Sequence, residues 1–230
     1  METTEPKPPA PIRDAATLIV VEQRPDGASV LMGQRNRGAI FMPGKFVFPG
    51  GAVDPADADI FPAMSDDLTK SLSVESGSDP RGLAAAAIRE LWEETGQIIG
   101  TPGDWPDAPP AWQGFAAAGY RPDATPLSFF FRAVTPAGRP RRFDARFFLA
   151  SATALCTDPD DFSQADDELS HLQWIDLDKA RHFDLPFITQ VVLAELRAHL
   201  ANPKAPYDPP FFRNDDEALL VQRLAGRSPL

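Results

Sequence analysis

The stretch from Asp79 to Gly96, "DPRGLAAAAIRELWEETG", constrains the fold most, because it carries signals for both ends of a helix. Asp79 is a preferred N-cap residue, Pro80 suits the first helical position, and Gly96 is typical of the position where a helix stops. Apolar residues at helical spacing predict the side of this helix that faces the core: Ala84, Ile88 and Leu91.

Three glutamates occupy another side of the same predicted helix. At 100° per residue, Glu90, Glu93 and Glu94 fall within about a third of the circumference. Arg89 precedes Glu93 by four positions and can pair with it, but one guanidinium cannot neutralise three acids. A solvated acidic face is the usual explanation for such charges. Clustered carboxylates also bind Mg²⁺ or Mn²⁺, which in turn hold phosphates, so the flanking sequence has to decide.

The upstream flank favours a metal site. The string "FVFPGGAVDPAD" reads as a short strand that leaves through Pro49, Gly50 and Gly51. Two adjacent glycines let a backbone turn sharply and approach another segment or a ligand closely.

Together the two strings resemble the signature of the Nudix hydrolases, G-x5-E-x7-R-E-U-x-E-E-x-G-U, where U is aliphatic. Gly51 supplies the first glycine, and the second half of the signature is met by Arg89, Glu90, Leu91, Glu93, Glu94 and Gly96. Three departures stand out. Asp57 takes the place of the first glutamate, and Gln97 takes the place of the last aliphatic residue. Residues 58–88 number 31 where the signature has seven, an insertion of 31 − 7 = 24 residues.

The resemblance implies a Nudix fold, an α+β protein in which a mixed β-sheet is packed between helices as an α/β/α sandwich. We expect a disordered N-terminal arm at residues 1–14, followed by one domain over residues 15–230. This domain would carry the insertion at about 58–80 and a C-terminal extension. Strands are predicted in "AATLIVVEQ", "ASVLMGQRN", "KFVFPGG", "LSFFFRAV", "RRFDARFFLASATAL" and "SHLQWIDL". A small helix is expected around residues 64–72, a long one over "LPFITQVVLAELRAHL", and a meandering loop at 101–126.

The resemblance also implies site roles. Arg89, Glu90, Glu93, Glu94 and Glu168 are the expected catalytic residues, and the four glutamates among them are the expected metal ligands. Glu168 stands six residues before Trp174, a spacing at which many Nudix proteins supply a loop carboxylate. A plainly solvated acidic loop is the alternative for Glu168, and a simple surface salt bridge is the alternative for Arg89.

Substrate phosphates are expected to meet arginine, whose planar fork suits phosphate oxygens. If "RRFDARFF" is a strand, Arg142 and Arg146 share a face and Arg141 lies on the other. Solubility of an edge strand is the alternative explanation for this charge. The expected substrate-binding residues are Arg141, Arg142, Arg146, Arg35, Gly50 and Gly51. The neighbouring aromatic run Phe129–Phe131 is expected to be core.

Composition narrows the class of function. A formal net charge of −11, with no basic block, argues against broad capture of nucleic acid. Cys156 is the only cysteine, so neither an internal disulfide nor a cysteine zinc cluster is expected. The N-terminal "METTEPKPPAP" lacks an apolar signal stretch, and no apolar run is long enough to span a bilayer. We therefore expect a cytoplasmic protein with no membrane partner.

The sequence thus favours a Mg²⁺- or Mn²⁺-dependent hydrolase of a nucleoside diphosphate linked to another moiety. The strings "FMPGKFVFPGG" and "RRFDARFF" resemble a Nudix subgroup that includes peroxisomal coenzyme A diphosphatases, whose signature is interrupted at the same place. Coenzyme A or an acyl-CoA is therefore the first expectation. ADP-ribose or a nucleotide sugar is the alternative substrate, and a ligand-sensing domain without catalysis is the alternative function. A small-molecule partner is expected in each case, and a homodimer is common in the family.

Overall fold

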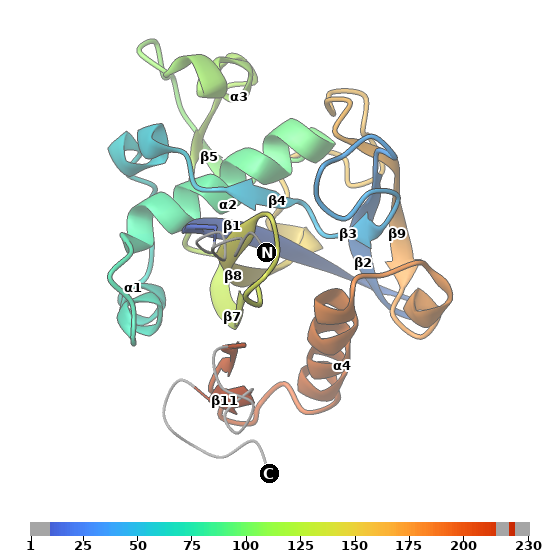
Figure 1. Ribbon diagram of the computed structural model, residues 1–230. Coiled ribbons are helices and arrows are strands. Elements are labelled where there is room, and N and C mark those ends of the chain that lie inside the picture. The colour runs from blue at the N-terminus through green and yellow to red at the C-terminus, as the bar shows by residue number, and fades with distance from the viewer. Residues whose placement is uncertain (1–9, 215–220, 224–230) are drawn as a thin grey trace.

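A computed structural model gives the structure of the chain and describes residues 10–214 and 221–223. The fold is α+β, with a mixed sheet of nine strands in the described residues (Figure 1). These strands are β1 Ile12–Arg24, β2 Gly27–Arg35, β3 Phe46–Val47, β4 Gly50–Ala52, β7 Ser128–Val134, β8 Arg142–Ser151, β9 Leu169–Asp176, β10 Pro210–Phe212 and β11 Val221–Arg223. The helices are α1 Asp66–Ser73, α2 Pro80–Thr95, α3 Gln113–Ala117 and α4 Phe187–Ala201.

The main path through the sheet has the order β11-β10-β7-β8-β1-β2-β3, with β4 paired to β1 and β9 paired to β2. The long central strand β1 runs parallel to β8 and antiparallel to β2. Each predicted strand of the sequence is therefore found in the sheet. The C-terminal β10 and β11 extend the edge next to β7.

Alternate residues of β1 point to opposite faces of the sheet, and each face is covered by a helix. Leu18 and Val20 are buried in one apolar cluster with α2, whereas Ile19 and Val21 are buried in a second cluster with α4. Figure 1 shows α2 and α4 on opposite sides of the strands. The expected α/β/α sandwich is thus confirmed.

The helix α2 has the predicted ends. Asp79 caps it by accepting hydrogen bonds from the backbone N–H groups of Arg81 and Gly82, and Gly96 ends it with a positive φ of 73°. Its burial exceeds the single predicted stripe, since every residue from Gly82 to Arg89 is buried. The run of alanines explains this, because small side chains let the helix lie close to the sheet on one side and to neighbouring loops on the other.

Two expectations about segment boundaries were wrong. Residues 12–14, assigned to the disordered arm, form the start of β1, where they pair with residues 142–144 of β8. The sequence did not predict this, because charged residues such as Arg13 and Asp14 are typical of a disordered arm, and their pairing with β8 depends on a distant segment. Residues 10 and 11 precede the strand, and residues 1–9 of the arm lie outside the described residues.

The second correction concerns residues 101–126, expected to be a meandering loop. They contain α3 and a two-stranded sheet of β5 Gly100–Pro102 and β6 Tyr120–Pro122. Trp112 and Phe115 anchor this unit, because both are almost fully buried and their rings meet at 5.3 Å. Of the prolines that suggested a loop, Pro102 and Pro122 end β5 and β6, whereas Pro106 and Pro126 lie in turns.

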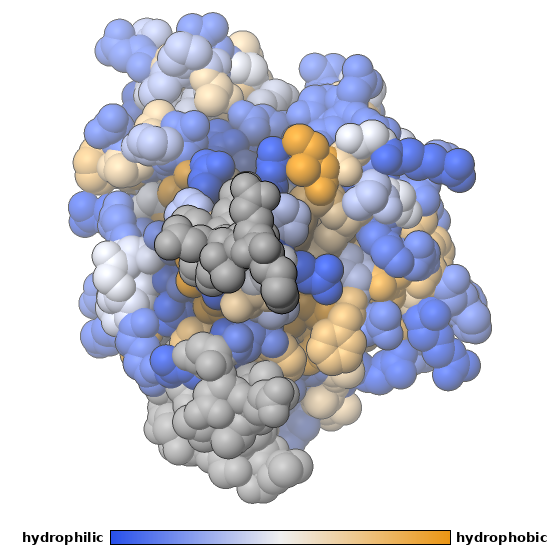
Figure 2. Space-filling view, in the orientation of Figure 1, coloured by the Kyte–Doolittle hydropathy of each residue, from blue (hydrophilic) through white to orange (hydrophobic). Residues whose placement is uncertain are grey.

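None of the helices in the described residues has the length and apolar character that crossing a membrane requires. Figure 2 shows a face on which hydrophilic residues predominate, in keeping with the negative net charge of the sequence.

Candidate active site

Gly50 and Gly51, the first two residues of β4, lie against the glutamates of α2. A Cβ atom placed on Gly51 would come within 2.5 Å of the carboxylate carbon and both oxygens of Glu90. A Cβ on Gly50 would meet the carbonyl oxygen of Ala16 at 2.6 Å. Gly50 also donates its backbone N–H to Glu94 Oε2 at 2.8 Å. Only glycine allows this approach, so the two halves of the motif form one constellation.

Arg89 is the centre of that constellation. Its Nε and Nη2 donate to the two carboxylate oxygens of Asp57, each at 2.9 Å, and Nη2 also reaches the carbonyl of Ala52. Its Nη1 donates to Glu90 and to Glu93, again at 2.9 Å. Although burial opposes it, this ring of acids holds the pKa of Arg89 above its usual value. Asp57 thus fixes the guanidinium, which in turn orients two glutamates.

Burial and mutual repulsion dominate the electrostatics of the glutamates. Burial raises the pKa of Glu90 to about 7, against the lowering effect of Arg89. Burial, followed by the charge of Glu90, raises the pKa of Glu94 well above its usual range, although the N–H of Gly50 opposes the shift. Burial also raises the pKa of Glu93. Carboxylates held in this way attract a cation strongly.

The loop before β9 brings Glu168 to the same place. Its backbone is tied to the end of α2, where the N–H of Asp166 donates to the carbonyl of Glu93 at 2.8 Å. The Glu168 carboxylate is half exposed and accepts a hydrogen bond of 2.7 Å from Arg35 Nη2. Its charge contributes to the raised pKa values of both Glu90 and Glu94, so these acids lie within electrostatic reach of one another.

The donor set suits a hard divalent cation. Four carboxylates gather around the end of α2, and Glu94 Oε1 is buried with no hydrogen-bond partner in the described part of the chain. Oxygen donors of this kind are the ones that Mg²⁺ and Mn²⁺ prefer. Within residues 10–214 and 221–223, however, no three acidic, histidine or cysteine side chains stand in a geometry ready to hold a metal ion. Binding of a cation by these four acids would require side-chain movement, since Arg89 and Arg35 engage three of them.

The expected substrate arginines separate into two groups. Arg35 reaches the acids of the site, as described above. Arg146 is instead almost fully buried on β8, where it pairs with Asp14 at 2.7 Å and Asp144 at 3.0 Å. Its Nη2 also donates to the hydroxyls of Ser76 and Ser78 in the insertion. We therefore leave Arg146 out of the substrate site and assign it to fastening the insertion onto the sheet.

The other two arginines lie away from these contacts. Arg142 is half-buried and donates from Nε to the carbonyl of Thr135, and Arg141 is exposed just before β8. In the described residues, hydrogen bonds and ion pairs connect neither of them to the glutamates of α2. Phe129, Phe130 and Phe131 are all buried, which confirms that this run belongs to the core.

Two contributions escaped the sequence reasoning. The role of Asp57 was open because aspartate is shorter than the glutamate of the signature, and its pairing with Arg89 depends on where the 3₁₀ helix η1, Pro55–Asp59, places it. Gln97 is fully buried, and its amide donates to the carbonyls of Asp158 and Asp161 while its Oε1 accepts from Thr157. Amide bonding to the following loop could have been suspected, because a glutamine there replaces an aliphatic residue.

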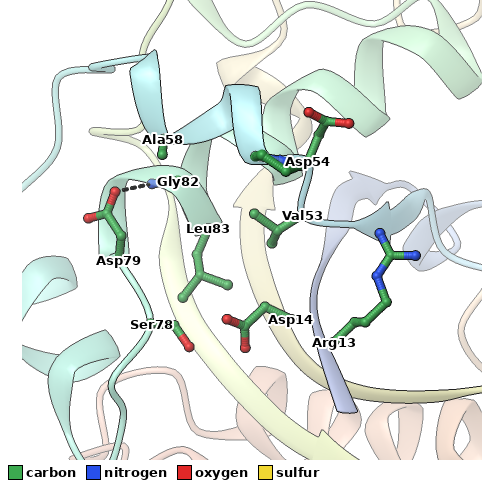
Figure 3. A pocket seen from close by; sticks show the side chains of 10 residues that line it. Arg13, Asp14, Val53, Asp54, Ala58, Ser78, Asp79, Gly82 and Leu83 are labelled. Atoms are coloured by element: carbon green, nitrogen blue, oxygen red, sulfur yellow. Dashed lines mark hydrogen bonds between the residues drawn. The ribbon is translucent and has the colours of Figure 1, made fainter. Parts of the chain in front are cut away.

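A pocket of about 330 Å³ opens at the other end of α2, near its N-terminus. Figure 3 shows Asp14 of β1 pointing toward Leu83 of that end and Arg13 pointing the other way, with the cap hydrogen bond from Gly82 to Asp79. Because Glu90, Glu93 and Glu94 lie in the last turns of α2, this pocket is separate from the acidic site.

Comparison with known proteins gives a consistent result. No family model matches the chain. The crystal structure of a Nudix hydrolase from Alicyclobacillus acidocaldarius is 30% identical in sequence, covers 85% of this chain and 94% of its own, and superposes with a TM-score of 0.63. The chain belongs to the Nudix hydrolase family. A protein called nudix hydrolase 7 in Caenorhabditis elegans is 27% identical over 93% of this chain and 73% of its own length.

Membership of the Nudix family agrees with the fold and makes the chain a Nudix-type hydrolase. Nudix hydrolases generally use divalent metal ions. The constellation of Gly51, Arg89 and the glutamates is the part of this chain that corresponds to the family signature.

Proposed function

We propose that this Nudix hydrolase cleaves the diphosphate linkage of a nucleoside diphosphate joined to a second moiety, and that coenzyme A or an acyl-CoA is its substrate. One observation carries the proposal of catalysis. Arg89 is fixed by Asp57 and orients Glu90 and Glu93 beside the Gly51 turn, with the buried Glu94 next to them. The proximity of Glu90, Glu93 and Glu94 in the last turns of α2 supports their proposed role as the acids that would hold a metal.

The residues divide the work as follows. Glu90, Glu93, Glu94 and Glu168 would hold Mg²⁺ or Mn²⁺, which neutralises phosphate charge and lowers the pKa of a bound water. Arg89 orients the glutamates, and Gly50 and Gly51 leave room for them. Glu90 would act either as a ligand to the ion or as a base beside it; burial raises its pKa to about 7 in the absence of metal, which suits the second role. Arg35 supplies a cation at the mouth of the site for the phosphates of the substrate.

Sequence resemblance alone supports coenzyme A within this class. The structure qualifies that support, because Arg146 of "RRFDARFF" contacts the insertion through Ser76 and Ser78. This part of the motif and the insertion therefore belong together for a structural reason. Direct measurement has to choose between coenzyme A and the alternatives, ADP-ribose and nucleotide sugars.

A substrate panel with Mg²⁺ or Mn²⁺ tests the proposal. Coenzyme A, an acyl-CoA, ADP-ribose, a nucleotide sugar, NADH and nucleoside triphosphates are incubated with the protein, and products are separated by chromatography. We expect coenzyme A to be cleaved to two phosphate-bearing products, and ADP-ribose to be the better substrate if the alternative holds. Tight binding of one compound without any cleavage would instead establish a ligand-sensing domain.

Substitution of Glu93 by glutamine gives the matched test of mechanism. Replacement of this carboxylate by a neutral amide should lower turnover by at least ~10²-fold while the fold survives. The reason is that the charge that develops in the transition state would lose part of its stabilisation. Asp67→Asn, an exposed acid on α1, serves as the control and should keep full activity. Equal activity of the two variants would remove Glu93 from the mechanism.

A further inference from the structure

Arg35 lies between two acids of the site but makes a hydrogen bond to only one of them. Its Nη2 donates to Glu168 Oε1 at 2.7 Å, whereas its Nη1 stands 4.0 Å from Glu94 Oε1, too far for a hydrogen bond. Both Glu94 Oε1 and Arg35 Nε are buried without a hydrogen-bond partner in the described residues. Buried polar atoms are normally paired, so this gap indicates a site built for another contact.

The guanidinium nevertheless supplies charge where it is needed. Glu94 is almost fully buried, and apart from its bond to the N–H of Gly50 the nearest opposite charge is that of Arg35. Arg89, the other arginine of the site, is fully engaged with Asp57, Glu90 and Glu93. Arg35 is therefore the cation that compensates Glu94 and Glu168.

The surrounding backbone fixes the position of Arg35, whereas the one hydrogen bond of its side chain in the described residues goes to Glu168. Arg35 pairs with Leu169 between β2 and β9, and its N–H donates to the carbonyl of Lys45 at 2.9 Å. Two other hydrogen bonds hold the loop that carries Glu168. The N–H of Asp166 donates to the carbonyl of Glu93 in α2, and the side chain of Asn36 donates to the carbonyl of Asp167. Rotation of one long side chain can thus release both acids without moving either segment.

We propose that Arg35 is an exchangeable counter-cation: its guanidinium holds Glu94 and Glu168 until a divalent cation takes these carboxylates, and it then turns to the diphosphate of the substrate. The second step deepens the proposed function, whereas the first depends only on the acids and Arg35. One side chain would thereby link cation binding to substrate binding. Arginine suits both partners, because its fork matches carboxylate and phosphate oxygens alike.

Mn²⁺ binding to the substrate-free protein tests the exchange. The free Mn²⁺ signal in electron paramagnetic resonance is titrated against the unsubstituted protein and the variants Arg35→Met, Arg35→Gln and Arg35→Lys. Removal of a competing, partly solvated cation should tighten Mn²⁺ binding about threefold to tenfold in Arg35→Met and Arg35→Gln. Arg35→Lys keeps the charge and should stay near the unsubstituted protein. Arg37→Met, an exposed arginine two residues away, controls for general loss of positive charge and should bind Mn²⁺ like the unsubstituted protein.

The opposite result is just as clear. If Arg35 only fastened the Glu168 loop, its loss would misplace a ligand and weaken Mn²⁺ binding in both neutral variants. Unchanged or weaker binding, in variants whose thermal unfolding shows them to be folded, would therefore overturn the exchange.

The second step is tested with methylene diphosphonate, which cannot be hydrolysed at its bridge, in saturating Mn²⁺. Isothermal titration should show about tenfold weaker binding to Arg35→Met than to Arg37→Met, because a charged hydrogen-bond donor to the phosphates is lost. Equal binding of methylene diphosphonate to the two variants would show that Arg35 does not contact the diphosphate. Neither titration requires turnover, so failure of the substrate panel leaves these results standing, and their failure leaves the panel standing.

Discussion

Asp57 and Arg89 are joined by two hydrogen bonds of 2.9 Å although they lie 32 positions apart in the chain. Asp57 is 1% exposed, and its carboxylate also accepts the backbone N–H of Asp54. The pair joins the two halves of the interrupted motif, because Asp57 precedes the insertion and Arg89 belongs to α2, which follows it. A shorter acid fulfils this role since η1 brings the Asp57 backbone close to α2.

Asp57→Ala should therefore be strongly destabilising. It removes the carboxylate that accepts from Arg89 Nε and Nη2, while Glu90 and Glu93 still balance the charge of Arg89, so we expect a loss of about 3 kcal/mol in the free energy of unfolding. Urea denaturation should show that loss, and turnover should fall as well because Glu90 and Glu93 lose their oriented partner. Asp59→Ala, an exposed acid in the same 3₁₀ helix, is the control. If both variants had the same free energy of unfolding, the anchoring role of Asp57 would be wrong.

The contact between Gly51 and Glu90 predicts a second effect. Gly51→Ala puts a methyl group 2.5 Å from the carboxylate, so Glu90 has to turn away from its place beside Arg89. We expect turnover to fall by at least ~10²-fold, since misplacement of about 1 Å at a catalytic group has that effect. Gly77→Ala is the matched control, because a Cβ there meets nothing within 4 Å. Steady-state kinetics of both variants, with thermal unfolding to confirm folding, would show whether the effect is specific to Gly51.

The sequence predicted α2, its caps and its acidic face because each depends on local chemistry. Asp79, Pro80 and Gly96 act within one turn of their own positions. The sandwich was also predictable, since strand alternation and the family resemblance agreed. The family assignment was then confirmed by comparison. The roles of individual site residues remain predictions that the experiments above address.

Other features could not be predicted because they depend on pairings between distant segments. The position of Arg146 on β8 placed it on the same face as Arg142, but nothing in the strand pattern revealed that Asp14, Ser76 and Ser78 would enclose it. The unit at residues 101–126 was missed for a similar reason. Its short elements are stabilised by packing of Trp112 and Phe115 rather than by propensity.

The raised pKa of Glu90 predicts how stability depends on pH in the protein freed of metal by a chelator. Burial makes the neutral acid the favoured form in the folded state and raises the pKa from 4.5 to about 7. The contribution is therefore fully present below pH 4.5 and is lost as the pH rises through about 7, by roughly 3 kcal/mol at most. Glu94, whose pKa is also raised, acts in the same direction.

Urea denaturation between pH 5 and pH 8 measures this dependence. Glu90→Gln should lose less stability over that range than the unsubstituted protein, because it cannot ionise at this position. Saturating Mg²⁺ should reduce the loss in the unsubstituted protein, since a cation that binds the ionised carboxylates stabilises the folded state. An identical pH dependence for Glu90→Gln would show that Glu90 titrates normally.

The network around Arg146 predicts that the insertion depends on a single buried guanidinium. Arg146→Met keeps the apolar stem but removes the ion-pair partner of Asp14, leaves Asp144 paired with Arg132 alone, and frees the hydroxyls of Ser76 and Ser78. We expect a loss of about 3 kcal/mol in the free energy of unfolding. Backbone amides at residues 74–79 should exchange with deuterium faster, because their link to β8 is gone.

Arg139→Met, an exposed arginine in the turn before β8, controls for charge and should change neither quantity. Uniformly faster exchange, without a maximum at residues 74–79, would mean that Arg146 stabilises the whole domain and does not specifically fasten the insertion.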